Sequence, residues 1–176
     1  MTEQTIASAP LVSPADAAFL DLTRDLFGHD RYANEQVFDT LATITPAPVD
    51  AIARMAHLVG CLELWISRFD GKGNPSTPLI WPDWSLEETR ERNTKTHDQW
   101  VGRLNVIDSA ELSRVVRCVP MAGGHKSYEV SVKDVLIQLP QHGAYHRGQV
   151  SVYIKDTGAK PLEVDYIYGK CRFVED

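Results

Sequence analysis

Two histidines four residues apart are the first feature of this sequence that could do chemistry. His142 and His146 lie within residues 132–154, a segment that carries apolar residues at helical spacing. In an α-helix, side chains four residues apart lie on one face, with Cβ atoms roughly 6 Å apart. Two imidazoles at that spacing can hold one metal ion, so the pair predicts a metal site.

The register of this predicted helix places both histidines on its inward side. Two series with a seven-residue period run through it: Val132, Leu139, His146 and Tyr153, and, three positions on, Val135, His142 and Gln149. Such paired series form the inward stripe of a helix in a bundle. A buried imidazole without a partner costs about 1–3 kcal/mol, so the pair favours a metal site. Two hydrogen-bonded core histidines remain the alternative.

Two glycines accompany the histidines on this helix. Gly143 and Gly148 each cost about 1 kcal/mol relative to alanine in a helix interior. Glycine also lets another helix or a ligand come close, because it has no side chain. We therefore expect a close approach to this helix near the histidines.

The charge balance argues against nucleic acid as a partner. Acidic residues number 24 against 18 Lys and Arg, the formal net charge is −6, and no basic run exceeds two residues. Phosphate contacts need clustered Lys and Arg, so no nucleic acid is expected. No stretch reaches 18 apolar residues, so no membrane-spanning helix is expected either.

The cysteines indicate a compartment. Cys61, Cys118 and Cys171 are widely spaced and contain no CxxC pair, so neither a disulfide framework nor a thiolate zinc knot is predicted. The first ten residues lack a basic region followed by an apolar run. We expect a cytoplasmic protein.

The elements that must position the histidines are four helices. Ser13-Pro14 and the pair Ser85 with Glu88 are start signals, while proline and glycine clusters follow the helical segments. The expected helices cover residues 13–43, 49–69, 85–107 and 132–154.

The remaining segments complete the predicted fold. Two β-favouring runs, residues 113–119 and 127–130, predict a hairpin before the last helix. Residues 1–12 are expected to form a flexible tail and residues 13–176 a single domain, with an extended, aromatic segment at 162–173 packed along the bundle. The predicted fold class is all-α, a four-helix bundle with a small β-hairpin before the last long helix.

Other side chains leave more than one interpretation open. His57 lies at the margin of the apolar face of the second helix, where a half-exposed surface histidine fits the periodicity as well as a ligand does. Trp81 and Trp84 either cover an edge of the core or line the mouth of a pocket. His97 lies in a strongly polar stretch and is expected in solvent.

Several stretches resemble one known family. Residues 142–149 read HGAYHRGQ and closely resemble the HxxxHRGQ signature of the DinB/YfiT-like superfamily of four-helix-bundle metalloproteins. His57, within residues 55–65, resembles the second-helix histidine of that family. Residues 30–34 (DRYAN) resemble its first-helix element, and residues 165–168 (DYIY) resemble its C-terminal segment.

The resemblance, which spans residues 13–170, implies a metal ion bound by His57, His142 and His146, with the remaining positions open to water. Three neutral imidazoles plus water fit a catalytic site, since a structural site would be closed by protein ligands. Zn²⁺ or Ni²⁺ is the expected occupant, and the ligand set does not separate them. The resemblance also implies a homodimer.

An open metal position predicts a class of chemistry. The ion can lower the pKa of a bound water towards ~7, or hold a thiol as a thiolate nucleophile. Characterised relatives resemble one another in the second use, with mycothiol, bacillithiol or glutathione. The implied function is a metal-dependent S-transferase, or a related lyase or hydrolase, acting on a small molecule with a low-molecular-weight thiol. Two alternatives remain: a non-catalytic metal-binding stress-response protein, and a dimeric bundle with an empty site.

Five residues are candidates for roles around the ligands. Asp30 or Asn34, and Gln149, could hydrogen-bond the non-coordinating ring nitrogens. Arg147 either binds a substrate carboxylate or forms a salt bridge at the bundle edge. Cys61 shares a helix face with His57 and is an alternative ligand, which would favour zinc.

Overall fold

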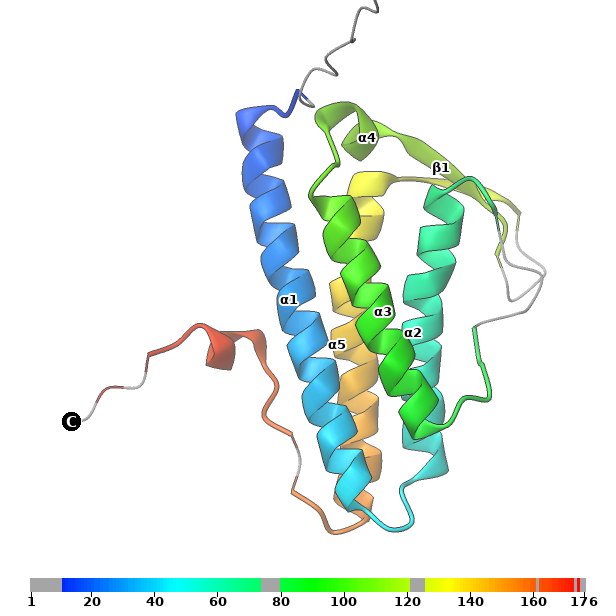
Figure 1. Ribbon diagram of the computed structural model, residues 1–176, viewed down its shortest axis with the longest axis vertical. Helices are drawn as coiled ribbons and strands as arrows, with labels where there is room; N and C mark the ends of the chain where they lie inside the picture. The colour runs from blue at the N-terminus through cyan, green and yellow to red at the C-terminus, as the bar shows by residue number, and fades with distance from the viewer. Residues whose placement is uncertain (1–10, 74–79, 121–125, 161, 173, 175–176) are drawn as a thin grey trace, which may run out of the picture.

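Four long helices lie side by side in the computed structural model, which describes residues 11–73, 80–120, 126–160, 162–172 and 174. They are α1 (Pro14–Thr43), α2 (Val49–Phe69), α3 (Leu86–Leu104) and α5 (Val132–Asp156). Both α1 and α2 contact α3 and α5, so the four helices enclose one core (Figure 1). The predicted all-α bundle is confirmed.

The helices begin and end where the local sequence signals place them. The Ser13 hydroxyl caps α1 by accepting from the Asp16 backbone N–H at 3.2 Å. The Ser85 hydroxyl caps α3 in the same way, with the Glu88 N–H at 3.1 Å. A serine hydroxyl satisfies a backbone donor that has no partner within the helix. The third helix ends at Leu104, three residues before the predicted position.

The predicted hairpin lies at the end of the bundle where α5 begins. Strand β1 (Val115–Cys118) pairs antiparallel with β2 (Tyr128–Ser131), and a short helix not predicted from the sequence, α4 (Ser109–Ser113), precedes them. The connection at residues 121–125 lies outside the described residues. Ser131 ends the hairpin and caps α5, because its hydroxyl accepts from the Asp134 N–H at 3.1 Å. The hairpin therefore fixes where α5 begins.

The bundle core is built around aromatic side chains. Trp100 is fully buried, with its ring centroid 5.3 Å from that of Phe27 and 5.5 Å from that of Phe69. Aromatic pairs at this separation add packing energy beyond the area they bury. Across the described residues, no helix combines the length and apolar character that crossing a membrane requires.

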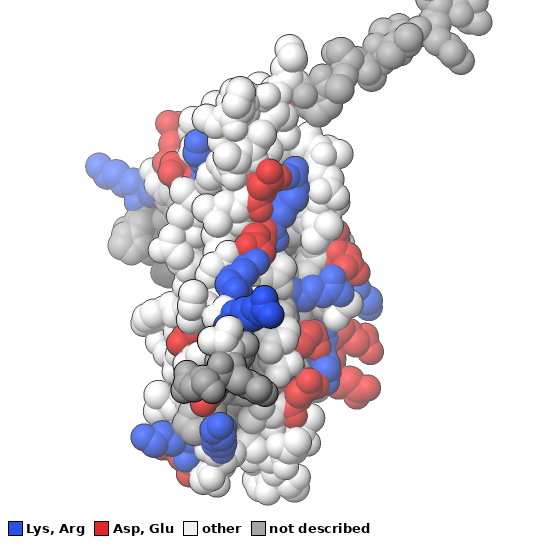
Figure 2. Space-filling model, turned by 90° about the vertical axis from the view of Figure 1, so that its left-hand side faces the viewer, with Lys and Arg blue, Asp and Glu red and all other residues white. Residues whose placement is uncertain are grey.

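The C-terminal segment runs along the outside of α1, as expected, with one 3-10 turn, η1 (Tyr166–Gly169). The Tyr166 hydroxyl donates to the Asp25 carboxylate at 2.6 Å, and Lys170 forms an ion pair with the same carboxylate. On the face drawn in Figure 2, Lys and Arg are interspersed with Asp and Glu, and much of the surface is uncharged. Of the predicted flexible tail, residues 1–10 lie outside the described residues.

Candidate metal centre

Three histidines from two helices converge inside the bundle. His57 projects from α2, and His142 and His146 project from α5. Ring centroids are 4.4 Å apart for His142 and His146, 4.7 Å for His57 and His146, and 5.4 Å for His57 and His142. The inward register predicted for α5 therefore brings its histidines against the second-helix histidine that the family resemblance pointed to.

Hydrogen bonds orient two of the three rings. His57 places Nδ1 against the backbone carbonyl of Ile80, and His146 places Nδ1 2.9 Å from Gln149 Oε1. Both partners are oxygens that accept, so each Nδ1 carries the proton and each Nε2 keeps its lone pair. Gln149 thus contacts a ring nitrogen, as expected. His142 Nε2 is buried and has no hydrogen-bond partner within the described part of the chain.

Burial keeps the three rings neutral. Desolvation is the main cause that lowers the pKa of His57, His142 and His146. For His142, with His146 and His57 as further causes, the pKa falls to about 4. Neutral imidazole is the form that binds metal ions, so the cluster is in its ligand form at neutral pH. A buried, unpartnered Nε2 beside two oriented imidazoles fits a bound metal ion.

Cys61 lies within the same cluster. Its Sγ is 3.7 Å from His57 Nε2, and donor atoms of His57, Cys61 and His142 all lie within 4.8 Å of one another. This group could bind a metal ion. Burial raises the pKa of Cys61 to about 11 against the opposing charge of Arg68, so the side chain is a thiol. A bound metal ion reverses this preference, because it stabilises the thiolate.

Trp81 covers the site. Its ring stacks on the His57 ring with centroids 4.1 Å apart and an interplanar angle of 15°, and the Arg54 guanidinium lies 4.7 Å from the Trp81 centroid. The sequence left open whether Trp81 covers the core or a pocket, and the structure places it against a candidate ligand. Neither this contact nor the Ile80 carbonyl was predicted, because the local sequence does not indicate that residues 80 and 81 lie against α2.

A cavity of about 510 Å³ adjoins the histidines between α2, α5 and the hairpin. Cys61 and His142 form the part of its wall nearest the cluster. Its polar lining includes Arg68, whose Nη1 donates to the Tyr128 hydroxyl at 3.2 Å, and Gln138. Small-molecule sites are typically apolar clefts of about 300–1,000 Å³ with a few polar groups. The candidate centre therefore opens onto a space that fits a small molecule.

Asp30, Asn34 and Arg147 hydrogen-bond to one another rather than to the three histidines among the described residues. Arg147 is 4% exposed, and its Nη1 donates to Asp30 Oδ1 and, at 2.8 Å, to Asn34 Oδ1. Asp30 and Asn34 are therefore placed against Arg147, where α1 meets α5, and their role around the ligand rings stays a prediction. Arg147 is not in a salt bridge at the bundle edge, since its ion pair with Asp30 is buried.

His97 corrects a further expectation, because it is 1% exposed rather than solvated. Its Nδ1 donates to the Asn93 carbonyl at 2.9 Å, and its Nε2 lies 3.2 Å from Asp30 Oδ2. Asp30 thus holds Arg147 on one oxygen and His97 on the other. We call Asp30, Asn34, His97 and Arg147 the buried polar network.

Acid is expected to destabilise the metal-free protein through His142. The unfolded ring has a pKa near 6.5 and the folded ring one of about 4, so the unfolded state takes up the proton first as the pH falls. Stability should therefore drop between about pH 6.5 and pH 4, by about 1–2 kcal/mol once solvent screening of this half-buried ring is allowed for. Urea denaturation of EDTA-treated protein across this range measures the loss.

The control is His142→Gln, which cannot titrate. Its stability should change less over the same pH range than that of the metal-free natural protein. If the two pH profiles coincide, His142 is not the source of the loss.

The four-helix arrangement with histidines from α2 and α5 defines a class of bundle proteins with a candidate metal centre. The model of the DinB family matches residues 21–170 of this chain, and the chain belongs to that family. The resemblance noted in the sequence is confirmed. The search of curated proteins found no match.

Proposed function

We propose that this protein is a divalent-metal-dependent enzyme that acts with a low-molecular-weight thiol, as an S-transferase or a related lyase or hydrolase. The observation that carries the proposal is the buried, unpartnered His142 Nε2, beside the other two imidazoles and on the wall of a small-molecule-sized cavity. A ligand atom without a partner, next to a space for a substrate, is what an open metal site requires.

The ligands of the proposed ion are His57, His142 and His146. Ile80 and Gln149 orient two of the rings by holding their Nδ1 protons, which leaves each Nε2 lone pair for the ion. A bound divalent ion supplies a Lewis acid that favours the thiolate form of a thiol at neutral pH.

The chain's own residues position the thiol and shield the site. Trp81, stacked on His57, excludes water from one side of the cluster. On the other side, the cavity lined by Arg68, Tyr128 and Gln138 offers polar groups for the body of a thiol such as a small peptide. The substrate would enter from this cavity, because it reaches both His142 and Cys61.

Metal analysis of protein purified without a histidine tag tests the ligand set. We expect about one divalent ion per chain, lost in His57→Ala and in His146→Ala but kept in Cys61→Ala. The reverse pattern, with the ion lost in Cys61→Ala and kept in His146→Ala, would replace the proposed set by His57, Cys61 and His142. Metal-free protein with unchanged melting behaviour would support an empty bundle instead.

Thiol binding can be detected in the absorption spectrum of the Co²⁺-loaded protein. In Co²⁺-loaded Cys61→Ala, which has no thiol of its own at the site, a small thiol should produce a sulfur-to-metal charge-transfer band in the near ultraviolet. The alcohol analogue of the same thiol is the matched control and should produce none. If no thiol from a panel gives the band, the thiol assignment fails and a non-catalytic metal-binding protein becomes the better description.

A further inference from the structure

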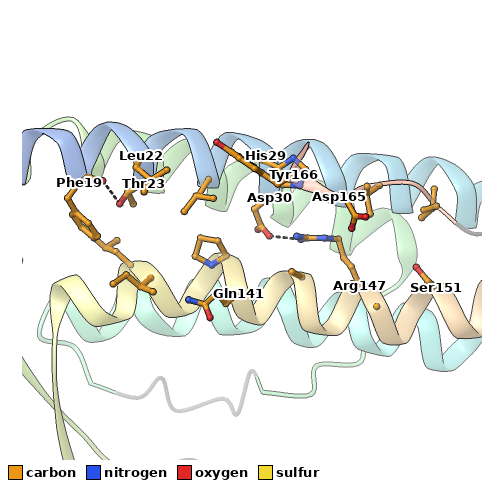
Figure 3. Close-up of a pocket in the computed structure, with 18 residues that line it drawn as sticks. Phe19, Leu22, Thr23, His29, Asp30, Gln141, Arg147, Ser151, Asp165 and Tyr166 are labelled. Atoms are coloured by element: carbon orange, nitrogen blue, oxygen red, sulfur yellow. Dashed lines mark hydrogen bonds and ion pairs between the residues drawn. The ribbon is translucent and has the colours of Figure 1, made fainter. Parts of the chain in front are cut away.

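A second cavity lies on the face of α5 that points away from the histidines. It has a volume of about 600 Å³ and lies between α1, α5 and the C-terminal segment. Figure 3 shows Phe19, Leu22 and Thr23 near one end and Arg147 and Ser151 towards the other. None of the three candidate metal ligands lines it. We call this space the α1–α5 groove.

The walls of the α1–α5 groove are mainly apolar. Most come from α1 and α5, and two residues of the C-terminal segment, Leu162 and Val164, add to them. Leu22 and Ile137 are 54% and 41% exposed, although Leu20 and Leu136 in the same helices are packed in the core. A concave apolar surface of this kind marks a binding site more often than a solvated face.

Arg147 is the buried residue in the groove lining that can offer hydrogen-bond donors from a charged group. All hydrogen bonds of Arg147 within the described residues leave from Nη1, to Asp30 and Asn34. Nε and Nη2 have no acceptor there, yet neither is among the fully buried atoms without a partner. Arg147 lines the groove, so we take these N–H groups as the donors available to a ligand there.

The surrounding charges select the kind of acceptor. Asp30 already balances the charge of Arg147, and Asp165 adds a second carboxylate to the groove lining. An incoming carboxylate would meet two like charges, whereas a carbonyl or hydroxyl oxygen can accept from Arg147 without repulsion. The chemistry therefore favours an uncharged acceptor.

The groove also indicates the length of its ligand. Ile137 and Arg147 both line it and are ten residues apart on α5, which corresponds to about 15 Å along the helix axis. An extended chain of about ten carbons fits that distance, with its polar end at Arg147.

We propose that the α1–α5 groove is a second ligand site, separate from the metal centre, for an elongated apolar molecule with one uncharged hydrogen-bond acceptor at its end. The apolar part of the ligand is flanked by Phe19 and Ile137. The acceptor at its other end receives a hydrogen bond from Arg147. The C-terminal segment, fastened to α1 through Tyr166 and Asp25, forms the third wall.

Decan-2-one and decanoate test the proposal as matched probes. Each is titrated at pH 8 against the full-length protein carrying the neutral dye Nile red, whose fluorescence falls on displacement. We expect displacement by decan-2-one at micromolar concentrations, and at least tenfold weaker displacement by decanoate. No displacement by decan-2-one overturns the site, and equal strength of the two probes overturns the uncharged-acceptor assignment.

The second test fills the α1–α5 groove with a larger side chain. Gly148 lines the groove, and a Cβ there would meet no other atom within 4 Å, so Gly148→Leu can place a side chain there with open space at its Cβ. Gly28→Leu, at an exposed position of α1 that also has open space, is the matched control. Urea denaturation first establishes that both variants fold.

We expect Gly148→Leu to weaken decan-2-one binding at least tenfold and Gly28→Leu to leave it unchanged. Equal weakening in both variants, or in neither, overturns the proposal. Analytical ultracentrifugation supplies the remaining outcome: if the natural protein is a dimer and Gly148→Leu is a monomer, a second copy of the chain covers the groove instead of a small molecule.

Discussion

Replacing Arg147 by methionine is expected to lower the free energy of unfolding by about 3–5 kcal/mol. Arg147 and Asp30 are 4% and 2% exposed, and their ion pair is part of the buried polar network. Methionine fills a similar volume but leaves the Asp30 carboxylate, which is 2% exposed, without its cation. Urea denaturation at pH 7 measures the loss. The two proteins are compared with the same m-value, the change in the free energy of unfolding with urea concentration.

Two further variants distinguish the cost of leaving a buried carboxylate unpaired from the cost of removing any arginine. Arg31→Met removes a cation from the pair with Asp98, in which both side chains are exposed, and should cost less than about 1 kcal/mol. The double variant Asp30→Asn/Arg147→Met removes both charges and should be more stable than Arg147→Met alone. Similar costs for Arg147→Met and Arg31→Met would contradict the argument.

The stability lost in Arg147→Met should depend on pH, and the pKa of Asp30 gives the direction of that dependence. In the natural protein, burial acts to raise the pKa of Asp30, but the charges of Arg147 and His97 outweigh it, and the pKa lies below its ordinary value. Without Arg147, burial should dominate and raise that pKa above the unfolded value. The penalty is then relieved as the pH falls and Asp30 takes up a proton. The stability gap between the two proteins should therefore narrow from pH 7 towards pH 4.

The helix bounds and the inward register of α5 could be predicted from the sequence because both depend on local patterns. Ser13 and Ser85 supply caps at fixed offsets, and Thr45 with Pro46 ends the first helix. The seven-residue series in α5 places His142 and His146 on the inward side by geometry alone. Patterns of this kind can be recognised in one sequence because they depend only on residues that lie close together in the chain.

The buried polar network could not be predicted in the same way. His97 was expected in solvent because the charged residues around it make the whole of α3 look polar. Asn93 and His97 lie four residues apart and share the inward face with Trp100, so the spacing was present, but a test for apolar periodicity does not register polar side chains. That spacing is the signal that would have found them.

Arg147 and Asp30 illustrate a second limit. They are 117 positions apart in the chain and meet only because α1 and α5 pack in one particular register. Arg147 follows directly after His146, yet on a helix consecutive residues point in different directions. Its neighbour in sequence faces the candidate metal centre, whereas Arg147 faces α1. One sequence supplies the residue types, but not the pairing between distant helices.

Gly143→Ala is expected to lower the free energy of unfolding by about 2–4 kcal/mol, although alanine is the better helix former. A Cβ at Gly143 would overlap Asp30 Oδ1 and would lie 2.9 Å from Arg147 Nη1 and 3.2 Å from Asp30 Cγ. Asp30 is short, buried and held on both oxygens, so it cannot move aside without breaking the buried polar network. Gly143 thus provides the close approach that the sequence led us to expect.

Gly148→Ala is the matched control, five residues further along the same helix. A Cβ there meets no atom within 4 Å, so the variant should gain about 0.5–1 kcal/mol from reduced freedom of the unfolded chain and better helix propensity. Urea denaturation of both variants measures the two effects, which should have opposite signs. A gain in stability for Gly143→Ala would mean that α1 and α5 can separate at this point without cost, and that the contact between Asp30 and α5 does not hold the two helices in register.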